Sequence, residues 1–194
     1  MKPYIIYSII MVFCLINNKI FAQDLPLIPY PQKVDFTEGS FEISKNIQFQ
    51  HGFAKTDEKD IENAFRFFNK SDLKFNRSKN KNSEIIFSIL PPKLPERHEN
   101  SYTIIVYPKQ IVIESDTKNG RFYAINTLLQ LFNYYENVGQ IPCMKISDSP
   151  KFFWRGMHLD VSRHFFPKDF IKKYIDFLVM YKMNTFHWHL TDDQ

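Results

Sequence analysis

The feature that most limits how this chain can fold is the alternation of strand and helix patterns after Pro150. The pattern predicts a strand at 155–161, a helix at 168–182 and a strand at 185–190. Pro167 suits the first turn of that helix, Asp169 suits its electropositive N-terminal end, and Asn184 suits a left-handed stop. Two strands joined by one helix are usually parallel neighbours with a right-handed crossover. The segment therefore predicts one strand–helix–strand unit of an α/β sheet or barrel.

The chain before Pro150 has a different pattern, in which strands and helices share one core. The expected elements are helices at 57–70 and 119–135, strands at 41–44, 47–50 and 84–90, a hairpin of strands at 102–107 and 111–115, and a loop at 74–83. Turn-forming residues at 147–152 mark a boundary. We therefore expect an α+β domain at 23–148, followed by the opening part of a second domain at 149–194.

The first 22 residues have the form of a secretory signal peptide, with a lysine, a short apolar run and a natural cut at Ala22–Gln23. The apolar run is too short to cross a bilayer. A buried N-terminal helix or an uncleaved anchor is an alternative, and a lipoprotein signal at Cys14 is a third, disfavoured by the bulky Phe13. Cleavage would leave Cys143 without a disulfide partner, so we interpret it as a small buried apolar residue. We expect an exported protein, periplasmic or secreted.

Charge and glycine content argue against two classes of binding protein. The formal charge is +4, and removal of a signal with two lysines and no acidic residue would leave 4 − 2 = +2. That charge is too weak to indicate a nucleic-acid-binding surface. The five glycines are scattered and form no phosphate-binding loop. We therefore expect no nucleic-acid partner, and no membrane association after signal cleavage.

Three polar side chains follow the two predicted strands of the second unit. Arg163 comes just after the first strand, and Asp192 and Asp193 come just after the second. Sites in α/β sheets and barrels collect beyond the carboxyl ends of parallel strands, so we expect these groups at one rim. A guanidinium held by a carboxylate can bind the vicinal hydroxyls of a sugar. A structural ion pair in a loop is the alternative.

The histidines of the second strand suggest a rival class of site. His187 and His189 are two residues apart and point to one face of the strand, with Trp188 on the other. Such a pair on an early barrel strand can hold a metal, with Asp192 as a further ligand, in a metal-dependent hydrolase. Hydrogen-bonded core histidines are the structural alternative. Asp160 is expected to be a buried structural partner of an arginine.

The joined pattern resembles that of a known enzyme family. "WRGMHLDVSRHFFP" followed by "KYIDFLVMYKMNTFHWHLTDDQ" resembles the opening of the catalytic barrel of glycoside hydrolase family 20, the β-N-acetylhexosaminidases. "LIPYPQKVDFTEGSFEI" and "GRFYAINTLLQL" resemble the accessory domain that precedes that barrel. The resemblance implies an α+β accessory domain followed by the first βαβ unit of a truncated (β/α)8 barrel, which when complete needs about 250 residues. We therefore expect a fragment of a longer chain.

The resemblance also implies a reaction and a role for the rim. Family members remove terminal N-acetylglucosamine or N-acetylgalactosamine from glycans with retention, because the substrate's own acetamido oxygen attacks the anomeric carbon. By this resemblance Arg163 binds ring hydroxyls of the terminal sugar, Asp192 belongs to the surrounding polar network, and Asp193 lies beside it. The substrate is then an oligosaccharide or glycoconjugate, and neither a metal nor another cofactor is implied.

The same resemblance limits what these residues are expected to do alone. The family's catalytic Asp-Glu pair has no counterpart among the 194 residues, so this chain is expected to be inactive by itself. A metal-dependent barrel hydrolase and a non-catalytic carbohydrate-binding module are the alternatives to a hexosaminidase.

Overall fold

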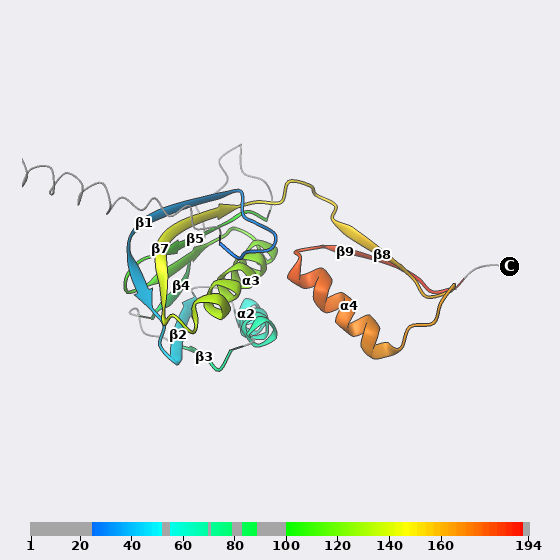
Figure 1. The fold of residues 1–194 in the computed structure, drawn as a ribbon, viewed down its shortest axis with the longest axis horizontal. Coiled ribbons are helices and arrows are strands. Elements are labelled where there is room, and N and C mark those ends of the chain that lie inside the picture. Colours follow the sequence, from blue (N-terminus) through cyan, green and yellow to red (C-terminus); the bar gives the residue numbers. More distant parts are fainter. Residues whose placement is uncertain (1–24, 52–54, 70, 79–82, 89–99, 192–194) are drawn as a thin grey trace, which may run out of the picture.

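The computed structural model describes residues 25–51, 55–69, 71–78, 83–88 and 100–191. These residues form a large sheet-and-helix unit, called here the first unit, and a small strand–helix–strand unit, called the second unit (Figure 1). The predicted signal peptide lies outside the described residues, as do Asp192 and Asp193. Within the described ranges, no helix has both the length and the apolar character that crossing a bilayer requires.

The first unit is built on a mixed seven-stranded sheet. Its strands are β1 (Lys33–Glu42), β2 (Asn46–His51), β3 (Lys74–Arg77), β4 (Ile85–Ser88), β5 (Tyr102–Val106), β6 (Ile111–Glu114) and β7 (Gln140–Asp148). They are arranged in the order β1-β7-β5-β6-β4-β2-β3. The β1–β7, β7–β5 and β5–β6 pairs are antiparallel, whereas the β6–β4, β4–β2 and β2–β3 pairs are parallel. The predicted hairpin is confirmed as β5 and β6.

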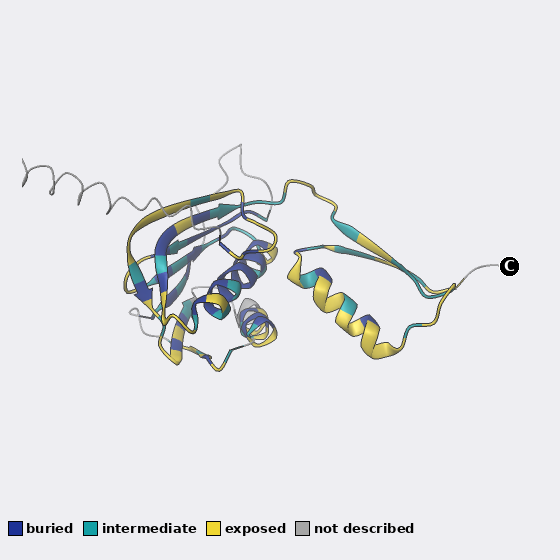
Figure 2. Cartoon of the chain, viewed as in Figure 1, coloured by how far each residue is buried: buried dark blue, intermediate teal, exposed yellow. Residues whose placement is uncertain are grey.

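Two helices lie side by side on one face of this sheet (Figure 1), α2 (Lys55–Phe68) and α3 (Lys118–Tyr135). The hydroxyl of Thr117 caps α3 by accepting a hydrogen bond from the Gly120 amide at 3.0 Å. Most of α3 is buried, as its dark blue colour shows in Figure 2. The residues predicted to face the core are buried, with Phe122 partly so: Ile61, Ala64, Phe65 and Phe68 of α2, and Ile125, Leu128, Leu129 and Phe132 of α3.

The expected loop at 74–83 is wrong for its first residues, which form β3 parallel to β2. The segment is rich in polar residues, but Phe75 stacks on the buried Phe65 with 4.7 Å between ring centroids. One aromatic ring therefore anchors an otherwise polar edge strand to the core. An edge strand needs apolar residues on one side only, which weakens its alternation signal.

The sequence did not predict β7, and it predicted only the end of β1. Pro142 argues against a central strand because it has no amide hydrogen to donate. In the structure Pro142 pairs with Ser40 where the β1–β7 register shifts, next to Gly39 at φ +100°. The pairing of β7 with β5 begins only at Met144, so Pro142 lies outside that ladder. The irregular register thus accommodates the proline within a nine-residue strand.

The second unit consists of β8 (Gly156–Asp160), α4 (Lys168–Met180) and β9 (Thr185–His189). The two strands are parallel neighbours, which confirms the prediction from the crossover pattern. Helix α4 packs on one face of the pair, where Tyr174 lies 5.6 Å from Phe186 between ring centroids. The helix is mostly yellow in Figure 2, and of its residues only Ile171 and Leu178 are buried. The two strands therefore cover only part of the apolar surface of α4, and Phe170, Ile175 and Phe177 stay exposed.

The end of α4 differs from the prediction. The left-handed residue is Lys182, at φ 58°, and not Asn184. The side chain of Asn184 instead accepts a hydrogen bond from the Arg155 amide at 2.9 Å and donates one to the Phe153 carbonyl at 2.7 Å. Asn184 thus ties the start of β9 to the start of β8.

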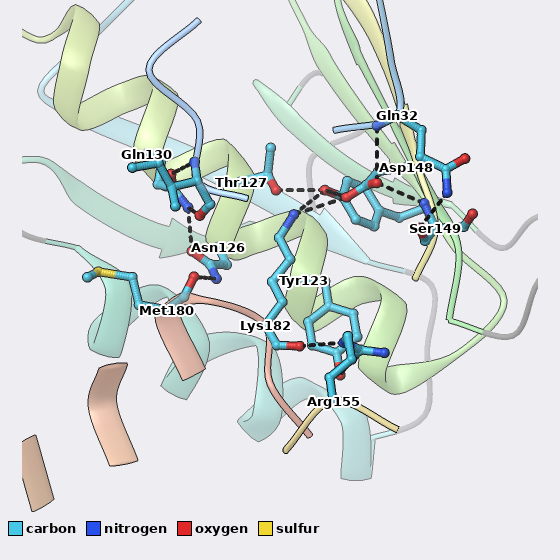
Figure 3. Close-up of polar contacts among 12 residues, drawn as sticks. Gln32, Tyr123, Asn126, Thr127, Gln130, Asp148, Ser149, Arg155, Met180 and Lys182 are labelled. Carbon is cyan, nitrogen blue, oxygen red and sulfur yellow. Dashed lines mark hydrogen bonds and ion pairs between the residues drawn. The ribbon is translucent and has the colours of Figure 1, made fainter. Parts of the chain in front are cut away.

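A buried polar network joins the two units (Figure 3). The Nζ of Lys182 lies 3.1 Å from Oδ2 of Asp148 and donates to the Tyr102 hydroxyl at 2.7 Å. The Tyr102 hydroxyl donates to the same Asp148 oxygen and lies 2.7 Å from the Thr127 hydroxyl. Burial raises the pKa of Tyr102, and the charge of Asp148 raises it further. Burial lowers the pKa of Lys182, and the attraction of Asp148 opposes that change.

Helix α3 also holds the end of α4. Asn126 is buried and donates from Nδ2 to the carbonyl oxygen of Val179 at 3.2 Å and to that of Met180 at 3.0 Å. Figure 3 shows the contact with Met180. Its own oxygen accepts a hydrogen bond from Gln130 at 3.0 Å. The contact with Met180 satisfies a carbonyl group of the kind that a helix end leaves without a partner, whereas the Val179 carbonyl also accepts a hydrogen bond from the Lys182 amide at 3.0 Å. The second unit is therefore oriented by α3 of the first unit.

Candidate functional site

Arg163 lies in the exposed turn between β8 and α4, just beyond the carboxyl end of β8. The register pairs Asp160 with His189, so β8 and β9 end at the same level of the sheet. The chain after β9 therefore leaves the sheet at the edge that carries Arg163. Asp192 and Asp193 follow there but lie outside the described residues, so their place beside Arg163 stays a prediction.

The carboxylate of Asp160 organises the turn that carries Arg163. Its Oδ1 accepts hydrogen bonds from the backbone amides of Ser162 at 2.9 Å and Arg163 at 3.1 Å. Its Oδ2 lies 3.4 Å from Nδ1 of His189. The amide of Val161 adds a hydrogen bond to the His189 carbonyl oxygen at 3.0 Å. The amide of Arg163, then that of Ser162 and the ring of His189, lower the pKa of Asp160, although partial desolvation opposes them.

The expectation for Asp160 itself is wrong. It was predicted to be a buried partner of an arginine side chain, but its own side chain is 29% exposed, and its partners given above are two backbone amides and a histidine ring. An aspartate at the end of a strand commonly accepts hydrogen bonds from amides two and three residues later, in an Asx turn. That spacing was present in the sequence as the Asp-Val-Ser-Arg run.

The histidines lie on the face of the two-stranded sheet that α4 does not cover. The ring of His158 is 4.7 Å from that of His187 and 6.2 Å from that of His189, between centroids. Trp188 lies on the opposite face and stacks against Phe186. Among the residues that the structure describes, no group of three or more His, Cys, Asp or Glu side chains is arranged to hold a metal ion. The three histidines therefore share one face of β8 and β9, and His189 lies at the strand end that carries the turn of Arg163.

Arg155 lies just before β8, at the end of the strand opposite to the turn of Arg163, and the local pattern did not predict its structural role. Its guanidinium donates to the Lys182 carbonyl at 2.8 Å, to the Phe152 carbonyl at 2.8 Å and to the Tyr123 hydroxyl at 2.9 Å. It therefore connects the start of β8 with the loop before β9 and with α3. At the next position, Gly156, an added Cβ would lie 2.7 Å from the ring of Trp154. The Arg-Gly pair thus fixes where β8 begins.

Comparison with known proteins identifies both units. The profile described as glycosyl hydrolase family 20, domain 2, matches residues 24–149, and the profile of the family 20 catalytic domain matches residues 152–194. A β-hexosaminidase of Vibrio furnissii is 43% identical over 100 residues, which are 52% of this chain and 16% of that protein.

Solved structures of this family share the fold. A β-N-acetylhexosaminidase of Bacteroides fragilis superposes with a TM-score of 0.73 at 30% identity, over 86% of this chain and 33% of that one. A family 20 exo-β-N-acetylglucosaminidase of Vibrio harveyi, solved in complex with N-acetylglucosamine, superposes with a TM-score of 0.70 at 31% identity, over 87% of this chain and 26% of that one. The present chain thus spans between 16% and 33% of the length of these three relatives.

Proposed function

The chain belongs to glycosyl hydrolase family 20, and we propose that it supplies the accessory domain and the first strand–helix–strand unit of the catalytic barrel of a β-N-acetylhexosaminidase. The enzyme removes terminal, non-reducing N-acetylglucosamine or N-acetylgalactosamine from an oligosaccharide or glycoconjugate. The parallel strands β8 and β9 carry this proposal, because their aligned ends put Arg163 at the edge where the chain continues into Asp192 and Asp193. Its support is the family membership together with the similarity to an enzyme solved with N-acetylglucosamine.

The reaction that we propose proceeds with retention and with assistance from the substrate. The acetamido oxygen of the sugar attacks the anomeric carbon as a carboxylic acid protonates the departing glycosidic oxygen, and water then opens the oxazolinium-like intermediate. This chain contributes to the binding of the sugar. The guanidinium of Arg163 donates hydrogen bonds to ring hydroxyls, and Asp192, with Asp193 beside it, accepts hydrogen bonds in the surrounding network.

Hydrolysis by the product of the complete open reading frame tests this function. It is expected to release nitrophenol from 4-nitrophenyl N-acetyl-β-glucosaminide but not from the β-glucoside that lacks the acetamido group. Arg163→Ala should lower kcat/KM by about 10- to 100-fold, as loss of hydrogen bonds from a charged group does. Arg66→Ala, an exposed arginine of α2, is the matched control and should leave kcat/KM unchanged.

Two results would contradict the proposal. One is a complete product that hydrolyses neither the N-acetylglucosaminide nor the corresponding N-acetylgalactosaminide. The other is equal hydrolysis of the glucoside and the N-acetylglucosaminide. Residues 1–194 alone are expected to give no turnover, because the resemblance assigns the acid and the intermediate-stabilising carboxylate to neither unit described here.

Export is a separate part of the proposal. Residues 1–22 would act as a signal peptide, with cleavage at Ala22–Gln23 and delivery to the periplasm or the medium. Mass spectrometry of the protein recovered from those fractions tests this. A mature N-terminus at Gln23 supports export, whereas an intact Met1 in the cytoplasm contradicts it.

A further inference from the structure

The turn between β8 and α4 carries Arg163 on an exposed surface, where a long side chain has many rotamers and its backbone needs support. Asp160 provides that support with both of its carboxylate oxygens. Its Oδ1 accepts hydrogen bonds from the amides of Ser162 at 2.9 Å and Arg163 at 3.1 Å, and its Oδ2 lies 3.4 Å from Nδ1 of His189. His189 is the last residue of β9. We call Asp160 with these three partners the β8–β9 clasp.

We propose that Asp160 is a positioning residue for sugar binding: through the clasp it fixes the backbone of Arg163 relative to the end of β9, which leads to Asp192. The inference rests on the proposed function, because it assigns Asp160 a task in the site where Arg163 binds the sugar. It assigns no contact between Asp160 and the substrate.

Exposure favours positioning over a large contribution to stability. The side chains of Asp160 and His189 are 29% and 31% exposed, and ion pairs in contact with water contribute little to folding. Two backbone amides of the turn converge on one carboxylate oxygen, which restricts the turn whatever the strength of the ion pair. The amide of Val161 donates to the His189 carbonyl and extends the connection by one residue beyond the strands. These hydrogen bonds thus hold the end of β8 against the end of β9, directly before the turn that carries Arg163.

The same contacts argue against Asp160 as a proton donor. Its two oxygens accept from three donors that favour the ionised form, and the hydrogen bond from the Arg163 amide is the largest cause of its lowered pKa. A general acid needs a raised pKa. Asp160 remains a carboxylate under ordinary conditions, which suits a hydrogen-bond acceptor.

A double-mutant cycle on the product of the complete open reading frame tests the clasp. The variants are Asp160→Ala, Arg163→Ala and the double variant, and the measurements are the Kd of N-acetylglucosamine and kcat/KM for the nitrophenyl substrate. Asp160→Ala should weaken binding on the order of tenfold, within the loss of about 100-fold that a displacement of about 1 Å can cause. The double variant should bind no more weakly than Arg163→Ala, since Asp160 acts only through Arg163.

Two further variants separate positioning from folding. Asp160→Asn keeps an oxygen for the two amides and should retain more affinity than Asp160→Ala. Asp176→Ala, an exposed aspartate of α4, is the matched control and should leave the Kd unchanged. Amide hydrogen exchange at Ser162 and Arg163 should accelerate in Asp160→Ala and less in Asp160→Asn, and far-UV circular dichroism shows whether each variant is folded.

The outcomes distinguish the clasp from the function on which it rests. Equal losses from Asp160→Ala with and without Arg163 would overturn the clasp alone, because Asp160 would then act independently of Arg163. Slow amide exchange at both turn residues in a folded Asp160→Ala protein would do the same. An Arg163→Ala protein that binds N-acetylglucosamine as tightly as the wild type would overturn the sugar-binding role of Arg163, and the clasp with it.

Discussion

The ammonium group of Lys182, in the loop after α4, lies 3.1 Å from the carboxylate of Asp148 at the end of β7, and the two side chains are only 8% and 13% exposed. The pair therefore connects the two units from within. Burial penalises both charges, so each depends on the other and on the hydroxyl of Tyr102.

We predict that Lys182→Met destabilises the chain by about 3 kcal/mol, because the carboxylate of Asp148 stays buried without its cation. Lys182→Met combined with Asp148→Asn should cost less than Lys182→Met alone, since the remaining amide is neutral. Urea titrations followed by tryptophan fluorescence measure this well. Both tryptophans of the sequence, Trp154 and Trp188, lie beside or within the second unit.

Lys172→Met is the control for that comparison, because Lys172 is an exposed residue of α4. It should change the free energy of unfolding by less than about 0.5 kcal/mol. The single variant Asp148→Asn completes the comparison. If the double variant loses as much stability as Lys182→Met and Asp148→Asn lose together when measured singly, the ion pair contributes no coupling.

Asn126→Ala should loosen the second unit from α3. The change leaves the Met180 carbonyl without the side-chain donor that satisfies it now, whereas the Val179 carbonyl keeps its hydrogen bond from the Lys182 amide. The expected cost is about 1–3 kcal/mol. Asn126→Asp should cost more, because a carboxylate would face two carbonyl oxygens. Thermal unfolding measures both, with the exposed Asn119→Ala of α3 as the control; equal melting temperatures for all three variants would contradict the assigned role.

Gly120→Ala tests the packing at the start of α3. Alanine is favoured over glycine within a helix by about 1 kcal/mol, so propensity alone predicts a more stable protein. At this position, however, an added Cβ would lie 2.7 Å from the backbone oxygen of Ser101 and would overlap the Ser115 hydroxyl. We therefore predict a net loss of about 1–3 kcal/mol. A variant that melts at or above the wild-type temperature would show that the first turn of α3 can shift to make room.

The second unit was predictable from the sequence because one helix between two short strands permits few arrangements. The crossover rule fixed β8 and β9 as parallel neighbours, and this placed Arg163 at the edge where the chain continues toward Asp192. The order of the large sheet depends on partners distant in sequence. The pairing of β1 with β7 brings together residues about 100 positions apart, and the local pattern of neither strand encodes it.

The missed site contacts have the same cause. Asp160 meets His189 across two strands, and that contact depends on register, which the sequence gives only as a periodicity of two. Lys182 follows a helix and reads as an exposed lysine, yet its partner Asp148 comes from the other unit. The resemblance to family 20 suggested the sugar-binding role that we propose for Arg163, but not the groups that hold its backbone in place.

The pH dependence of stability should reveal the clasp without any substrate. The pKa of Asp160 is lowered from its ordinary 3.8, first by the Arg163 amide. A carboxyl group whose pKa is lower in the native state contributes stability above its unfolded pKa and loses it as the pH falls through the native value. The difference in unfolding free energy between wild type and Asp160→Asn should therefore be small, because the group is partly exposed, but at its largest at neutral pH. It should shrink as the pH falls from about 3.8, the ordinary value, through the lower native pKa, below which the native wild-type carboxyl is neutral like the amide.

Urea titrations of residues 1–194 from pH 7 to about pH 2.5, followed by tryptophan emission, measure this difference. Comparison with Asp160→Asn removes the contribution of the other carboxyl groups, which both proteins share. Asp176→Asn is the matched control, since the same chemical change on the exposed side of α4 should give no gap that closes on acidification. A gap between wild type and Asp160→Asn that stays constant, or widens, as the pH falls would mean that the carboxylate charge of Asp160 does not hold the turn, because only the ionised form accepts from the two amides and His189 together.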